Sequence, residues 1–165
     1  MSFSRHRGKE MNFIRDKELA LRFQSNSVPS QERFFYFIFT IILTMIISSP
    51  VYMFAFYSSP LSKWHICIHV LSLVIVIVGT IFCYRSNKSG DDKEFIERYI
   101  SIAFPTGIRT FFIMLPAGLL FYGAIALFRE TGLPHTASIY DFIWQAIFLG
   151  YFYWRLNSLI KLASH

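Results

Sequence analysis

Four long apolar runs, separated by polar segments, set the pattern of this chain. They cover residues 34–57, 64–84, 110–128 and 139–160, and the first three contain no Lys, Arg, Asp or Glu. About 20 apolar residues in a helix cross the hydrocarbon core of a bilayer, so each run predicts a transmembrane helix. The connections within the first pair and within the second pair are short, which predicts two helical hairpins. The expected fold is therefore an all-α integral membrane protein with four spans.

The polar stretch 89–109 separates the two hairpins, and residues 91–104 within it show the pattern of an amphipathic helix. Glu94 and Arg98 are spaced i, i+4 on the polar face, which favours an ion pair between them. Pro105 and Gly107 then predict the end of this helix before the third span begins.

The apolar face of helix 91–104 has two candidate destinations, the lipid interface or a protein partner. Arg98 and Arg109 favour the lipid interface, because basic side chains can flank a membrane surface. The residues assigned to this lipid or partner face are Phe95, Ile96, Arg98, Tyr99, Ile100 and Arg109.

Residues 1–32 form a polar, basic segment without the apolar run of a cleavable signal peptide. Part of it, residues 9–24, is compatible with a short helix. That segment is either a solvated tail or a surface helix that rests on anionic lipid through Arg15, Lys17 and Arg22. The rest of the chain, residues 33–165, is expected to form one transmembrane domain.

Basic residues indicate how the spans are oriented. Seven Lys or Arg precede the first span, five lie in and around the middle stretch, and two lie at the carboxy-terminal end, whereas the other two connections hold one each. Because cytoplasmic loops of membrane proteins carry the excess of Lys and Arg, both termini and the middle stretch are predicted to be cytoplasmic, in the inner cell membrane. The net charge of +6 is spread over these flanks rather than gathered in one patch, so nucleic acid is an unlikely partner.

Each span also carries polar residues at a similar predicted depth in the outer leaflet. Polar groups in hydrocarbon bond to one another or line a cavity. The predicted layer consists of Ser48, Ser49, His69, Tyr122 and Gln145. Hydrogen bonding between helices explains such a layer, and a water-filled pocket or conduction path is the alternative.

Two histidines are weak candidates for metal binding. His65 and His69 share a helix face at i, i+4, but no further ligand lies at suitable spacing, so neither a metal nor another cofactor is expected. Cys67 and Cys83 lie about 24 Å apart along one helix, too far for a disulfide.

Enzyme motifs are absent from the sequence, which predicts a non-catalytic protein. The first hypothesis is a homo-oligomeric membrane component that recruits or restrains a cytoplasmic protein, as in phage defence or toxin immunity. That hypothesis is an argument from class rather than from a motif. A homo-oligomeric pore is the second hypothesis, and a metal or redox protein that uses His65 and His69 is the third.

Overall fold

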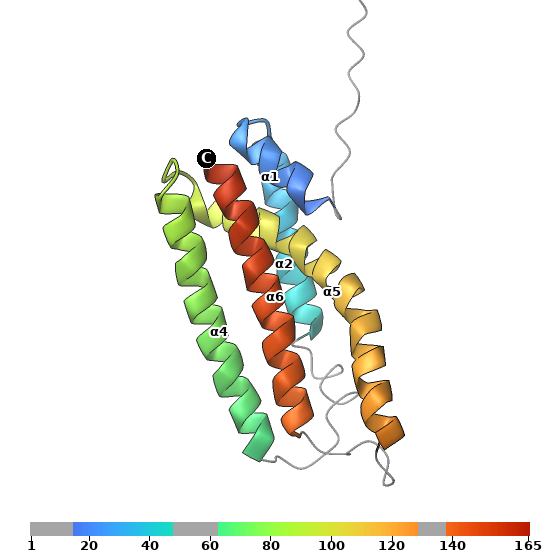
Figure 1. Ribbon diagram of the computed structural model, residues 1–165. Helices are drawn as coiled ribbons and strands as arrows, with labels where there is room; N and C mark the ends of the chain where they lie inside the picture. The colour runs from blue at the N-terminus through green and yellow to red at the C-terminus, as the bar shows by residue number, and fades with distance from the viewer. Residues whose placement is uncertain (1–14, 48–62, 129–137) are drawn as a thin grey trace, which may run out of the picture.

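The computed structural model describes residues 15–47, 63–128 and 138–165 (Figure 1). These residues form five helices and contain no strand, which confirms the all-helical prediction. The helices are α1 (Asp16–Gln24), α2 (Ser30–Ile47), α4 (Lys63–Lys88), α5 (Phe95–Phe128) and α6 (Ile139–Ser164).

Two of these helices are long and apolar enough to cross a membrane, namely α4 and the Phe95–Leu127 part of α5. Most of their apolar side chains face outward, as Leu73, Leu119 and Leu120 illustrate with exposed fractions of 60%, 71% and 77%. Such a surface suits lipid better than water. Helix α6, which contains the fourth predicted span, is not one of these two helices, and the end of the first predicted span lies outside the described residues, so the count of four spans stays a prediction.

Helix α5 continues through Pro105 and Pro116, so the prediction that a separate helix ends near Pro105 and Gly107 is wrong. Figure 1 shows that α5 changes direction along its length rather than breaking. A proline within a helix removes one backbone donor and bends the helix, but packing can hold the bent helix together. Ile102, Pro105 and Thr106 are all fully buried, and the Thr106 hydroxyl donates to the carbonyl of Ile102 at 2.7 Å. Tertiary packing therefore outweighs the tendency of Pro105 and Gly107 to end the helix.

The described core lies at one end of the bundle, where α1, the beginnings of α2 and α5, and the carboxy-terminal ends of α4 and α6 meet (Figure 1). We call this region the polar end. Helix α1 packs on α5 and α6, α2 packs on α5, and α6 packs along α4. The fully or almost fully buried apolar side chains include Leu19, Phe23, Tyr36, Ile102, Leu156 and Ile160.

Candidate functional site

Part of the predicted lipid or partner face of the middle stretch packs against the protein itself. The Phe95 ring packs against Tyr84 and Tyr99, with centroids 5.4 and 5.5 Å apart. The Tyr99 hydroxyl shares hydrogen bonds with Thr80 of α4 and Tyr153 of α6, each at 3.2 Å. Phe95 and Tyr99 thus join α5 to its neighbours while each stays partly exposed, so whether they also face lipid or a partner stays a prediction.

Arg98 is also internal, with a residual exposure of 2%. Its guanidinium donates to both carboxylate oxygens of Asp91, at 2.5 and 2.6 Å, and to Asn87 at 3.2 Å. The hydrogen bonds from Arg98 lower the pKa of Asp91 below its ordinary value. The predicted pair of Glu94 with Arg98 is not formed, because Arg98 makes this bidentate contact with Asp91 instead. The contact also fixes the turn between α4 and α5.

Ile96 and Ile100 of the predicted face line a groove between α2 and α5. We call it the α2–α5 groove. Its volume is about 340 Å³. Ile96 and Phe34 are 70% and 57% exposed. The groove is lined by Ser30, Arg33, Phe34, Phe37, Ile96, Glu97, Ile100 and Ser101.

The rim of the α2–α5 groove carries an excess of negative charge. Arg33 donates to Glu94 at 2.7 Å and to Glu97 at 2.6 Å, so one cation serves two carboxylates. Both glutamate side chains stay accessible, 42% exposed for Glu94 and 55% for Glu97. The groove therefore offers apolar side chains beside a net negative charge.

A second charged group ties α1 to the rest of the bundle. The Asp16 carboxylate has no exposed surface, and it accepts hydrogen bonds from Arg109 of α5 at 2.8 Å and from Arg155 of α6 at 3.1 and 3.2 Å. Burial acts to raise the pKa of Asp16, but the hydrogen bonds from Arg155 and Arg109 outweigh it, and the pKa lies below its ordinary value. We call these three residues the Asp16 cluster. Sequence reasoning did not predict it.

Helix α1 is consequently a packed element of the polar end rather than a solvated tail. Leu19, Ala20 and Phe23 enter the core. Arg22, which was predicted to contact anionic lipid, instead donates two hydrogen bonds to Glu32 of α2. Arg15 and Lys17 remain on the surface.

Two of the residues predicted to form an intramembrane polar layer, Tyr122 and Gln145, bond to separate partners. The Tyr122 hydroxyl donates to Asp141 at 2.6 Å, and the Gln145 side chain donates to Ser72 at 3.1 Å. His69 is exposed on the surface of α4. Ser48 and Ser49 lie outside the described residues. The two hydrogen bonds join α5 to α6 and α6 to α4, which is the structural role expected of polar groups between membrane helices.

The candidate metal ligands occupy different surroundings, since His65 is buried and His69 is exposed. Within residues 15–47, 63–128 and 138–165, no group of three His, Cys, Asp or Glu side chains is placed to hold a metal ion. Cys67 is an exposed free thiol, and Cys83 is a buried one.

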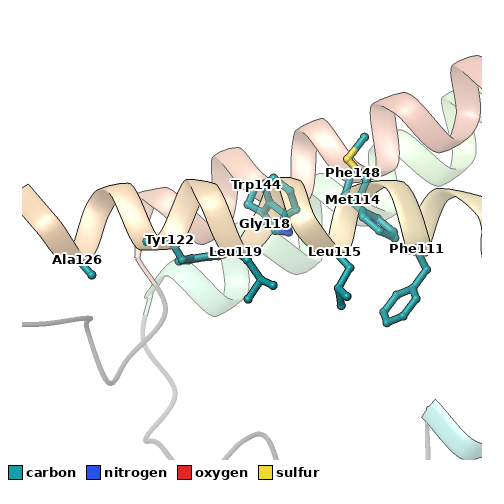
Figure 2. Close-up of a pocket in the computed structure, with 10 residues that line it drawn as sticks. Phe111, Met114, Leu115, Gly118, Leu119, Tyr122, Ala126, Trp144 and Phe148 are labelled. Carbon is teal, nitrogen blue, oxygen red and sulfur yellow. The ribbon is translucent and has the colours of Figure 1, made fainter.

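An apolar groove of about 490 Å³ lies between the carboxy-terminal half of α5 and the amino-terminal half of α6 (Figure 2). Leu115, Leu119 and Phe111 project from α5 on the side shown, and Trp144 of α6 lies against Gly118. This surface suits lipid chains or another helix, and it provides no paired acid and base for catalysis.

Known proteins give no further guide to these features. No protein-family model matches the chain, and neither a curated protein nor a solved structure matches it. The polar end, with the α2–α5 groove and the Asp16 cluster, is the part of the described structure where ion pairs between helices gather.

Proposed function

We propose that this chain is a non-catalytic, four-span protein of the inner cell membrane that recruits or restrains a protein partner through the α2–α5 groove. Both termini and the polar end are cytoplasmic in this proposal. The partner supplies an apolar segment that carries a basic residue. A membrane component of a multi-gene system, such as phage defence or toxin immunity, would act through a contact of this kind.

The outward apolar surfaces of α4 and α5 support the membrane placement. The distribution of Lys and Arg supports the orientation, since the amino-terminal segment, the middle stretch and the carboxy-terminal end carry almost all of them. The described core at that end gives the cytoplasmic face a fixed shape.

The observation that carries the partner proposal is the combination of exposed Ile96 and Phe34 with the two carboxylates that share Arg33. Cytoplasmic leaflets are rich in anionic lipid, which attracts basic segments and repels carboxylates. Of the two arginines that favoured lipid in the sequence, Arg98 is bound to Asp91 instead, and Arg109 does not line this groove. These contacts favour a protein segment over lipid as the occupant of the groove.

Labelling of cysteines at the two ends of α4 tests the membrane placement. In a variant without Cys67 and Cys83, a cysteine replacing Lys63 is expected to react with an impermeant maleimide added outside intact cells. A cysteine replacing Ser89, in the exposed turn after α4, is expected to react only after the membrane is opened. Labelling of both positions in intact cells, or of neither after opening, would contradict the proposed topology.

Photo-crosslinking tests the groove. A photoreactive residue in place of Ile96 is expected to give a covalent adduct with one protein in cells. Replacing Glu94 and Glu97 together by Gln is expected to reduce that adduct about tenfold, because close charge pairs at an interface contribute on the order of 1.5 kcal/mol or more. A photoreactive residue in place of Leu21, an exposed apolar residue of α1, is the control and is expected to give no such adduct. Adducts with lipid alone, or an adduct that the Gln variant leaves unchanged, would contradict the proposal.

A further inference from the structure

A basic pocket of about 600 Å³ lies where the beginning of α1 meets α5. Its lining consists of Arg15, Asp16, Lys17, Glu18, Leu21 and Arg109. Asp16 is also bound by Arg155, so four cationic side chains surround two carboxylates. The pocket keeps an excess of two positive charges after these internal contacts, opposite in sign to the rim of the α2–α5 groove.

The cations of the pocket can reach a ligand. Arg109 is 43% exposed, and its contact with Asp16 uses one of the five N–H donors of a guanidinium. The Arg15 side chain is 76% exposed and makes an exposed contact with Glu18 at 3.4 Å, the kind of ion pair that is weak in solvent. Lys17 is exposed as well. Arg22, in contrast, is engaged by Glu32 and is not part of the pocket.

The position of the pocket along α5 points to a membrane surface. Directly after Arg109 and the buried Thr110, the chain presents Phe111, Phe112 and Ile113, which are 53%, 62% and 41% exposed. Arg109 therefore stands at the boundary between a polar and an apolar surface. Figure 1 shows the beginning of α1 beside the part of α5 that leads into this apolar surface, and α1 and α5 pack together.

We propose that this pocket binds the phosphate group of an anionic phospholipid of the cytoplasmic leaflet, through Arg15, Lys17 and Arg109. A guanidinium forms strong, charge-assisted hydrogen bonds with phosphate oxygens, and lysine adds a point charge. The acyl chains of the same lipid lie against the exposed aromatic residues that follow Arg109. The binding site is assembled by α1 docking, because the Asp16 cluster holds Arg109 next to Arg15 and Lys17.

This inference rests on the membrane placement proposed above but not on the α2–α5 groove. The two surfaces divide the polar end, the basic pocket facing lipid and the acidic rim facing a protein. Bound lipid would hold α1 at the membrane surface and so fix the orientation of the groove next to it.

Thermal unfolding of the full-length protein in mild detergent tests the site. Short-chain phosphatidylglycerol at about ten times its dissociation constant is expected to raise the unfolding midpoint by about 3 °C, whereas short-chain phosphatidylcholine raises it less than half as much. Replacing Arg15 and Lys17 together by Gln is expected to remove most of the difference between the two lipids. Both side chains are exposed, and the ion pair of Arg15 with Glu18 lies on the surface, so the variant is expected to unfold at the wild-type temperature without lipid.

Inorganic phosphate at matched ionic strength distinguishes a soluble ligand from a lipid. A midpoint shift from phosphate as large as that from phosphatidylglycerol would overturn the lipid assignment. Equal shifts from the two lipids, or a phosphatidylglycerol shift that persists in the Gln variant, would overturn the site itself. Cysteine labelling at Lys63 and Ser89 reports separately on the membrane placement, so failure of that premise is distinguishable from failure of the pocket.

Discussion

Replacing Asp16 by Asn is expected to release α1 from α5 and α6 and to lower the free energy of unfolding by about 1–3 kcal/mol. Removing one partner of a buried ion pair costs about 3–5 kcal/mol, because the other charge is left buried and unpaired. Arg155 and Arg109 are 24% and 43% exposed, so water solvates them in part and the expected loss is smaller. Chemical denaturation of the purified protein in detergent would measure this loss. Limited proteolysis would show whether α1 becomes accessible.

The matched control for Asp16→Asn is Glu18→Gln, two residues further along α1. Glu18 pairs with Arg15 on the surface, and such a pair contributes about 0–1 kcal/mol. The control variant is expected to unfold like the wild type and to keep α1 protected from protease. Equal stability of the two variants would show that the Asp16 cluster does not hold α1 in place.

Acid titration of the wild type and of Asp16→Asn provides a second measurement of the Asp16 cluster. The pKa of Asp16 is lowered in the folded state, so its contribution to stability is complete above the ordinary pKa of an aspartate, about 3.9. That contribution is lost as the pH falls through the lowered pKa. The stability of the wild type is therefore expected to decline below about pH 4 more steeply than that of Asp16→Asn. Asp91 contributes in the same direction in both proteins, since its pKa is also lowered.

The sequence predicted α4 and α6 because each depends on a continuous local pattern. The run 64–84 falls inside α4, and 139–160 falls inside α6. The continuity of α5 through Pro105 was not predicted, because a proline and a glycine at this spacing usually end a helix. What keeps α5 continuous is the burial of Ile102 and Thr106 against other helices, and no spacing within the segment reports that burial.

The charged contacts were missed for a related reason. The rule for helical neighbours paired Arg98 with Glu94, whereas its partner Asp91 precedes the helix and is not subject to that rule. Asp16 lies 93 and 139 residues from its two partners in the sequence, so only the tertiary fold brings them together. The sequence placed the candidate site on the apolar face of one helix, whereas the structure offers a groove and a pocket that each require two helices.

Gly79→Ala is expected to disturb the packing of α4 against α6. A Cβ atom at Gly79 would overlap the ring of Tyr153, which is itself buried. The ring cannot move freely, since its hydroxyl is hydrogen-bonded to Tyr99 of α5 at 3.2 Å. Overpacking of this kind costs about 1–3 kcal/mol, and we expect chemical denaturation to show a decrease of that size in the free energy of unfolding.

The control for Gly79→Ala is Gly150→Ala in α6, where a Cβ atom would meet no described atom within 4 Å. Alanine is a better helix former than glycine by about 1 kcal/mol, so this variant is expected to be as stable as the wild type or more so. The two variants make the same chemical change within helices, and only the neighbour differs. An equal effect of both substitutions would contradict the close approach of α4 to Tyr153.

A second background separates steric overlap from any other effect at Gly79. In Tyr153→Leu the ring is gone, so Gly79→Ala is expected to cost at least 1 kcal/mol less there than in the wild type, a coupling typical of residues in direct contact. Tyr153→Leu alone is also expected to destabilise the protein, because the hydroxyl that bonds Tyr99 is lost. If the cost of Gly79→Ala were the same in both backgrounds, the glycine would be required for a reason other than the ring. If the cost is coupled as expected, the close approach of α4 to α6 depends on the Tyr153 ring, whose hydroxyl also bonds Tyr99 of α5.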